Sequence, residues 1–216
     1  MKTLVLTFLI VFNGAVTDAF ARSDSLGSGT LRGRYFLMVW GYQGPGNAPK
    51  DSHSFAAFYD GDDLADGRVI PATISWLPAS GRPHLLGVEP GRNFSLAETL
   101  ALACKTGKQV ASLGPYEITF DLYQRALARI RTLRSGRVAY SALALRSGSM
   151  NCIRAAGDIT ARPFHPGIAY GWAASRVIAR HFTPFFKNGG GMNHTLAPFL
   201  IAKGCGQRTA QSTEIR

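Results

Sequence analysis

Acidic residues are scarce in this sequence, and after its first 21 residues it has no apolar run long enough to cross a bilayer. A membrane-spanning helix needs roughly 20 consecutive apolar residues, so we expect the rest of the chain not to span a membrane. Only 13 Asp and Glu stand against 24 Lys and Arg among 216 residues, giving a net charge of +11. This charge favours anionic partners but does not determine the fold. With 46% hydrophobic and 11% aromatic residues, the chain has enough apolar material for one folded domain, which excludes wholesale disorder.

The start of the chain has the pattern of an export signal. Lys2 supplies a positive charge, residues 4–16 are apolar, and residues 19–21 read Ala-Phe-Ala, a small-x-small cleavage pattern. The alternative, a buried N-terminal helix, is disfavoured by the Asn-Gly pair at 13–14, which interrupts the helical pattern. We therefore predict a signal peptide over 1–21 and an exported protein, periplasmic or secreted. Its anionic partners would then be cell-wall polymers or lipid surfaces, and nucleic acid is not expected.

Cysteine is also scarce. Three cysteines in an exported chain cannot all pair internally, so at least one is free or bonds to another chain. Cys104 lies in a helical run and Cys205 lies near the C-terminus. We predict a disulfide between these two, which leaves Cys152 reduced. The alternative is that Cys104 is a core residue of its helix and never meets the C-terminal segment.

Sequence patterns that bind metals or nucleotides are missing. The five His and three Cys show no paired ligand spacing, and no Gly-rich phosphate loop follows a strand. Asp60, Asp62 and Asp63 alternate as in a calcium loop, but the glutamate that closes such a loop is absent, so a solvated turn is favoured. We expect no metal and no cofactor.

Turn-forming residues and hydrophobic periodicity divide the chain. Residues 22–34 are rich in Ser, Gly and Arg and predict a flexible leader, 35–186 a single domain, and 187–216 a Gly-rich C-terminal tail. We expect strands over 35–42, 53–59, 69–77 and 138–145, with the second and third forming a hairpin, and helices over 95–103, 119–133, from 151 onward, and over 168–181. Because no regular βαβ alternation is present, this order predicts an α+β fold in which an antiparallel sheet packs with helices.

Cys152 is the residue best placed for chemistry. It follows Asn151 after a Gly-Ser loop and begins a predicted helix, with Arg154 two residues later. The positive end of a helix and a basic neighbour both lower the pKa of a thiol and favour the nucleophilic thiolate. The alternative is a buried, inert side chain, since free cysteine is among the most buried residue types.

A cysteine nucleophile needs a base within hydrogen-bond reach, and histidine is the usual one. Of the five histidines, His53 differs by opening a predicted strand directly after a Gly- and Pro-containing loop. A strand holds its side chains more rigidly than a loop does, which suits a catalytic base. A purely structural role for a histidine in this position is the alternative.

Several blocks of the sequence resemble, in the same order, an uncharacterised family of bacterial exported proteins. They are the segments at 35–39, 52–58 (SHSFAAF), 73–78 (TISWLP), 114–118 (GPYEI) and 151–153 (NCI). More distantly, a strand-borne histidine ahead of an Asn-Cys pair is similar to the circularly permuted papain-like enzymes, among them NlpC-type amidases and relatives of lecithin:retinol acyltransferase. This resemblance implies a permuted papain-like arrangement with His53 as base and Cys152 as nucleophile. It implies an exported thiol hydrolase or acyltransferase that attacks an amide or ester through an acyl-cysteine intermediate.

The permuted enzymes orient the base with a polar residue on the neighbouring strand. If the predicted hairpin turns near Leu64, Ser75 lies opposite His53 and Thr73 is its diagonal neighbour on the same face. Either hydroxyl could orient the imidazole, although a carboxylate, amide or imidazole is the usual choice. Tyr116 is a candidate donor to an oxyanion, with a half-buried structural aromatic residue as the alternative.

Other interpretations of the same residues remain open. His165 or His194 as base would restore the order of ordinary papain-like enzymes, in which the cysteine comes first. A non-catalytic, basic envelope-binding module on the same fold is the alternative function. A nucleic-acid binder is a third class, which the export signal disfavours.

Overall fold

The computed structural model describes residues 30–46, 48–144 and 147–200. The predicted signal peptide at 1–21 and Cys205 lie outside these residues. The strands are β1 (Tyr35–Gln43), β2 (Ser52–Asp60), β3 (Ala72–Ile74), β4 (Trp76–Pro78), β5 (Glu89–Asn93), β6 (Gln109–Ile118), β7 (Ala139–Tyr140) and β8 (Ser149–Met150). The helices are α2 (Gly61–Ala65), α3 (Leu96–Lys105), α4 (Phe120–Arg134), α5 (Cys152–Gly157), α6 (Gly171–Phe182) and α7 (Ala197–Leu200), with 3-10 turns at Pro49–Asp51, Thr183–Phe185 and Asn188–Gly190. No helix within the described ranges is long and apolar enough to cross a membrane.

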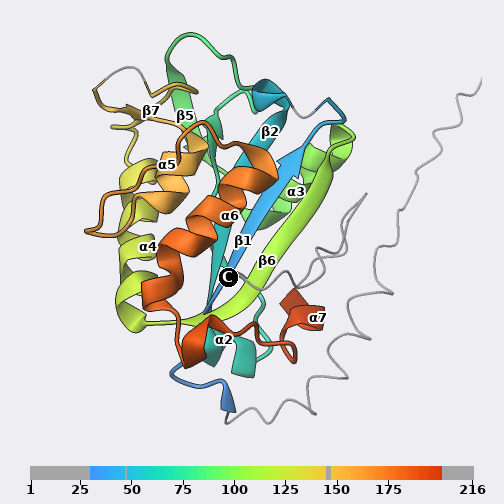
Figure 1. Ribbon diagram of the computed structural model, residues 1–216, viewed down its shortest axis with the longest axis vertical. Coiled ribbons are helices and arrows are strands. Elements are labelled where there is room, and N and C mark those ends of the chain that lie inside the picture. The colour runs from blue at the N-terminus through green and yellow to red at the C-terminus, as the bar shows by residue number, and fades with distance from the viewer. Residues whose placement is uncertain (1–29, 47, 145–146, 201–216) are drawn as a thin grey trace, which may run out of the picture.

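The strands form two four-stranded sheets. The larger has the order β3-β2-β1-β6 and is antiparallel throughout. The smaller has the order β4-β5-β7-β8, in which only the β7–β8 pair is parallel. Figure 1 shows β1, β2 and β6 running through the middle of the molecule, with α4, α5 and α6 on the near side. Antiparallel sheets packed with helices make this an α+β fold, as the sequence predicts.

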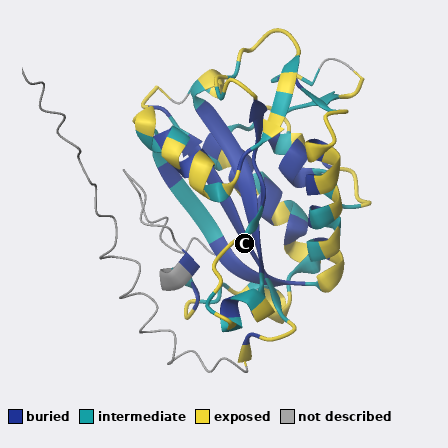
Figure 2. Cartoon of the chain, turned by 180° about the vertical axis from the view of Figure 1, so that it is seen from behind, coloured by how far each residue is buried: buried dark blue, intermediate teal, exposed yellow. Residues whose placement is uncertain are grey.

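The alternation of side chains along β1 and β2 separates two hydrophobic clusters. Side chains on one face pack with α4, α5 and α6; this cluster includes Leu37, Val39, Ala56, Phe58, Leu122, Ala155 and Ile178. Side chains on the other face pack with α2, α3 and α7; this cluster includes Phe36, Met38, Trp40, Phe55, Leu64, Leu100 and Leu196. Because both faces are covered, the central strands are buried along almost their whole length (Figure 2).

Side-chain caps fix where three helices begin. Ser95 accepts a hydrogen bond from the backbone N–H of Glu98 and completes a capping box at the start of α3. Thr119 caps α4 by accepting from the N–H of Leu122, and Asn151 caps α5 by accepting from the N–H of Arg154. Each cap satisfies a backbone donor that the helix itself leaves unpaired. The helix starts predicted near Ser95, Thr119 and Asn151 are therefore confirmed.

The predicted strand over 69–77 is wrong in extent. Pairing with β2 begins only at Ala72, after Pro71, whose nitrogen carries no hydrogen to donate, and Ile70 before it is exposed. The run is then interrupted at Ser75, where the chain passes from β3 in the larger sheet to β4 in the smaller one. Of the strand predicted over 138–145, the described residues 138–144 contain only the two residues of β7.

Two further elements differ from expectation. The acidic turn predicted at 60–63 is the start of helix α2, because the Asp60 carboxylate accepts from the N–H of Asp62 and caps it. The helix predicted from 168 begins at Gly171, after Tyr170 in an extended conformation. Gly171 itself has φ of +53°, a conformation that favours glycine.

The described parts of the predicted leader and tail pack against the sheet. Leu31 is buried, and the carbonyl of Arg34 accepts from the N–H of Gly61 at 2.7 Å. In the C-terminal segment, Met192 forms an antiparallel bridge with Tyr116, and Leu196 is buried. A Gly-rich composition indicates backbone freedom, but it does not reveal the apolar contacts that these segments make.

Candidate functional site

The nucleophile candidate Cys152 is the first residue of α5. Asn151 holds this end of the helix in place, because its Oδ1 accepts from the N–H of Arg154 at 2.9 Å and its Nδ2 donates to the carbonyl of Ala142 at 3.1 Å. Cys152 is a buried free thiol. The site prediction that requires a reduced Cys152 is therefore compatible with the structure.

The base candidate His53 is the second residue of β2 and is 1% exposed. Its ring stacks on Phe55, with centroids 5.3 Å apart, and lies against Tyr42. Strand β3 pairs with β2 only over 56–58, so β2 has no strand partner on this side at His53. Ser52 and His53 line a cavity here.

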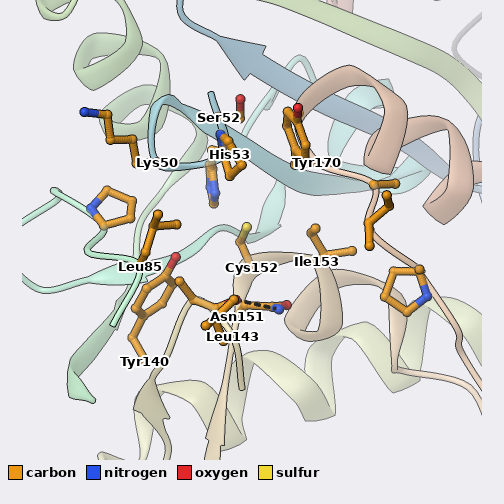
Figure 3. Close-up of a pocket in the computed structure, with 18 residues that line it drawn as sticks. Lys50, Ser52, His53, Leu85, Tyr140, Leu143, Asn151, Cys152, Ile153 and Tyr170 are labelled. Atoms are coloured by element: carbon orange, nitrogen blue, oxygen red, sulfur yellow. Dashed lines mark hydrogen bonds between the residues drawn. The ribbon is translucent and has the colours of Figure 1, made fainter. Parts of the chain in front are cut away.

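The cavity brings the two candidates together. It has a volume of about 410 Å³, and His53 and Cys152 both line it, together with residues of the loops before β2 and α6. In Figure 3 the sulfur of Cys152 points toward the strand that carries His53. Neither His165 nor His194 is among the residues that line this cavity, so the structure does not bring the alternative bases to the thiol.

The other side of the imidazole is held by a row of hydroxyl groups. Nε2 of His53 lies 2.9 Å from Oγ of Ser75, and this Oγ lies 2.7 Å from Oγ1 of Thr99. Oγ1 of Thr99 also lies 2.7 Å from the carbonyl oxygen of Ser95. Ser75 and Thr99 are both fully buried, so these groups have no water to replace a missing partner.

The row couples the tautomer of His53 to the hydroxyl proton of Thr99, which has two acceptors within reach: Oγ of Ser75 and the carbonyl of Ser95, which also accepts from the N–H of Thr99. When Thr99 donates to Ser75, Ser75 donates to Nε2 of His53 and the imidazole proton is on Nδ1. When Thr99 donates only to Ser95, Ser75 donates to Thr99 and Nε2 donates to Ser75, which leaves Nδ1 as an acceptor. This Nδ1 is buried and has no hydrogen-bond partner in the described part of the chain.

The electrostatics of the pair favour the neutral state of both groups. Burial lowers the pKa of His53 to about 3. Burial also raises the pKa of the Cys152 thiol, an effect opposed by backbone N–H groups of Ser54, Ile153 and Cys152 itself, which point at the sulfur. At neutral pH the cavity thus holds a protonated thiol and a neutral imidazole, and no hydrogen bond joins them, since Nδ1 of His53 has no partner among the described residues. The thiolate that the helix-end position predicts is not the resting form, because burial outweighs the amides.

The strand register differs from the predicted one. Thr73 pairs with Ala57, whereas the predicted hairpin pairs it with Phe55. Ser75 consequently reaches the imidazole from a diagonal position, helped by the break in the strand. The hydroxyl of Thr73 bonds to the carbonyl of Pro71 at 3.4 Å, so the predicted role of Thr73 in orienting His53 is wrong.

Tyr116 is also misplaced by the prediction. It lies in β6 opposite Leu37, which pairs with Phe58, five residues along β2 from His53. At the usual rise of a strand, Phe58 lies about 17 Å along β2 from His53, and Tyr116 lies farther away, on the other side of β1. Tyr116 stacks on Phe186 at 4.5 Å between centroids and does not line the cavity. An oxyanion role at Cys152 is therefore excluded by distance.

Three polar residues of the site escape the sequence analysis. Thr99 lies one turn into α3, and nothing in its local sequence distinguishes it from a surface threonine. Asn93 bonds the backbone at the break between β3 and β4: it accepts from the N–H of Ser75 at 2.9 Å and donates to the carbonyl of Thr73 at 2.8 Å. Tyr140 lines the cavity near Cys152, and burial raises the pKa of its hydroxyl. All three act through tertiary contacts between segments far apart in the chain.

The remaining cysteine and acidic residues lie outside the cavity. Cys104, on α3, is disulfide-bonded; its predicted partner Cys205 lies outside the described residues, so the pairing stays a prediction. Asp62 accepts from the N–H of Gly33, and Asp63 pairs with Arg68 at 2.6 Å. Among residues 30–46, 48–144 and 147–200, no group of three or more His, Cys, Asp or Glu could hold a metal ion.

Comparison with known proteins adds no relative: no protein family, curated protein or solved structure matches the chain. The interpretation of the site therefore rests on its own geometry.

Proposed function

We propose that this protein is an exported thiol hydrolase or acyltransferase in which Cys152 is the nucleophile and His53 the base. The observation that carries the proposal is the presence, in one cavity, of a free thiol and a histidine whose Nδ1 has no hydrogen-bond partner among the described residues. In the proposed resting state Thr99 donates to the carbonyl of Ser95, so that Ser75 accepts from the Nε2–H of His53 and Nδ1 is free to act as the base.

The proposed reaction has two halves. In the first, the Cys152 sulfur attacks the carbonyl carbon of an ester or amide while Nδ1 of His53 takes the thiol proton. The bond from the carbonyl carbon to the leaving group then breaks, the leaving group takes that proton from Nδ1, and an acyl-cysteine thioester remains. In the second half, water or another acceptor attacks the thioester and gives its proton to Nδ1. The sulfur leaves and recovers the proton, which restores the starting state.

The neutral resting state requires general-base catalysis. With the pKa of His53 near 3 and the pKa of Cys152 raised by burial, the proton moves as the sulfur attacks rather than beforehand. Backbone N–H groups of Ser54 and Ile153 directed at the sulfur would stabilise the thiolate when it leaves in the second half.

A permuted papain-like arrangement and an exported location belong to the same proposal. The base lies on a strand that precedes the cysteine-bearing helix in sequence, which is the order of the permuted enzymes. The disulfide at Cys104 suits an oxidising compartment, where such bonds persist. The signal pattern at 1–21 predicts the same location.

The test is the turnover of 4-nitrophenyl acetate together with the mass of the intact protein. The account predicts a covalent acetyl adduct on the wild-type protein and none on Cys152→Ala. His53→Gln should lower kcat by roughly 100-fold or more, the range of a lost general base. His181→Gln is the matched control, since His181 also bonds a threonine hydroxyl, that of Thr160 at 3.0 Å, but lies outside the cavity. Equal turnover by wild-type and Cys152→Ala protein would overturn the proposal.

A further inference from the structure

Three large aliphatic side chains are exposed around the cavity that holds Cys152. Leu85 is 46% exposed, Leu143 51% and Ile168 96%, and all three belong to the lining of the cavity. They come from three separate segments, before β5, after β7 and before α6. Exposed aliphatic side chains are ordinary when scattered singly, but three of them around one cavity form an apolar rim.

The inner wall continues this apolar character. Eleven of the eighteen lining residues are Pro, Gly, Ala, Leu or Ile, and Lys50 is the only one with a formal charge at neutral pH. Figure 3 shows Leu85, Leu143 and Ile153 around Cys152. A volume of about 410 Å³ is within the usual range for a site that encloses a small ligand.

Two polar side chains of the wall, Asn151 and Ser52, are engaged with the protein itself. Asn151 uses its Oδ1 on the N–H of Arg154 and its Nδ2 on the carbonyl of Ala142. Ser52 donates its hydroxyl proton to the carbonyl of Ala48 at 2.8 Å. An extended peptide brings a donor and an acceptor at every residue, and each one buried without a partner costs free energy. Asn151 and Ser52 therefore offer a peptide no free hydrogen-bonding group, which leaves the Lys50 ammonium and the hydroxyls of Tyr140 and Tyr170 as the side-chain partners in the wall, whereas an aliphatic chain needs none.

We propose that the acyl group accepted by Cys152 is an unbranched aliphatic chain, delivered as an ester. This inference rests on the proposed function and names its substrate class. The chain lies along the apolar wall and the rim formed by Leu85, Leu143 and Ile168, with its carbonyl carbon at the sulfur. The covalent step is the one already described: the carbon–sulfur bond forms, the bond to the leaving alcohol breaks, and the alcohol takes the thiol proton by way of His53 Nδ1.

The experiment measures kcat/KM for 4-nitrophenyl esters from acetyl to decanoyl, with the Cys152→Ala protein as background. Each methylene that enters the cavity should raise kcat/KM by about fourfold until the cavity is filled. A polar comparison uses the pentanoyl ester against the N-acetylglycyl ester, which has the same chain length but carries an amide. After each rate is divided by the rate of that ester with a free thiol in solution, the pentanoyl ester should be the faster substrate.

A substitution in the rim tests whether the rise of kcat/KM with chain length comes from contact with the rim. Ile168→Ser should reduce the gain in kcat/KM per methylene for the longer chains. Ile70→Ser is the matched control, because Ile70 is an isoleucine of comparable exposure, 81%, outside the cavity lining. It should behave as the wild type at every chain length.

The outcomes separate the two proposals. Rates that do not change with chain length, a faster N-acetylglycyl ester, or equal slopes in Ile168→Ser and wild-type protein would overturn the aliphatic substrate while an acyl-cysteine still forms. Failure of every ester to form a Cys152-dependent adduct would instead overturn the proposed function itself.

Discussion

Nε2 of His53 lies 2.9 Å from Oγ of Ser75, and this contact leaves Nδ1 as the imidazole nitrogen without a hydrogen-bond partner among the described residues. Ser75 is available for it because the strand breaks at this residue, between β3 and β4, where Asn93 bonds the backbone on both sides. Oγ of Ser75 in turn lies 2.7 Å from Oγ1 of Thr99, one turn into α3, so the direction of this hydrogen bond decides whether Ser75 donates to His53 or accepts from it. The candidate base is therefore oriented by residues from three segments.

Thr99→Val should disturb catalysis without removing any group that touches a substrate. Without the Thr99 acceptor, the Ser75 hydroxyl donates to Nε2 of His53, and the imidazole proton moves to Nδ1. We expect kcat to fall by roughly tenfold or more with KM little changed, and Thr99→Ser to restore it. The imidazole nitrogen NMR shifts of His53 should report the change of tautomer.

The control for this variant is Thr106→Val. Thr106 lies just after the end of the same helix and donates its hydroxyl to the carbonyl of Leu102 at 2.8 Å, but it is exposed and has no contact with Ser75. It should leave kcat and the His53 signals unchanged. A Thr99→Val protein with wild-type kcat and unshifted His53 signals would show that the hydroxyl row does not position the base.

Burial of neutral His53 makes stability depend on pH. Its pKa is about 3 in the folded protein, against an ordinary value of 6.5 in the unfolded chain. Between these values the unfolded chain binds a proton that the folded one does not. Above pH 6.5 this difference in protonation does not affect the free energy of unfolding. As the pH falls from 6.5 toward 3, the free energy of unfolding decreases by up to about 1.4 kcal/mol per pH unit.

Urea unfolding at a series of pH values measures this slope. The wild-type free energy of unfolding should fall more steeply below pH 6.5 than that of His53→Gln, which has no group to protonate. Parallel curves for the two proteins would mean that His53 titrates normally in the folded state.

The thiol of Cys152 should titrate above the ordinary range of a cysteine. Burial raises its pKa, so alkylation by iodoacetamide should accelerate with pH into the alkaline range and show no plateau near neutrality. Mapping the modified residue by mass spectrometry ties the profile to Cys152. A plateau extending below pH 7 would indicate a preformed thiolate–imidazolium pair and contradict the neutral resting state.

Asn93→Ala should destabilise the junction between the two sheets. It removes the partners of the Ser75 N–H and the Thr73 carbonyl, and leaving such partly buried groups unpaired costs about 1 to 3 kcal/mol. Thermal unfolding should show the loss. Asn93→Asp keeps the acceptor for Ser75 and should recover part of it; equal losses in the two variants would place the effect elsewhere.

The parts of the fold that follow from local chemistry could be predicted from the sequence. The strands at Tyr35 and His53, and the helix starts at Ser95, Thr119 and Asn151, each have a signal within a few neighbouring residues: a β-branched and aromatic run, or a capping side chain. The order of strands and helices sufficed for the α+β class. His53 and Cys152 were selected for similar reasons, a rigid strand and a helix start, and the structure brings both to one cavity.

The parts that depend on register and tertiary packing could not be predicted. The position of Thr73 does not follow from the sequence, because helix α2 replaces the turn assumed in the hairpin and the pairing shifts by two residues. The position of Tyr116 does not follow either, because its distance from the site is a property of the sheet as a whole. The role of Thr99 has no local signal, because it comes from a contact with Ser75, 24 residues earlier in the chain.

The most direct test of the account is the identity of the residue that carries the acyl group during turnover. Protein quenched in acid while it hydrolyses a 4-nitrophenyl ester should yield a peptide in which Cys152 bears the acyl group as a thioester, and the adduct should disappear after hydroxylamine treatment. Cys152→Ala should give neither the adduct nor turnover above background. An acyl group found on another residue, or undiminished turnover without Cys152, would contradict the assignment of this thiol as the nucleophile.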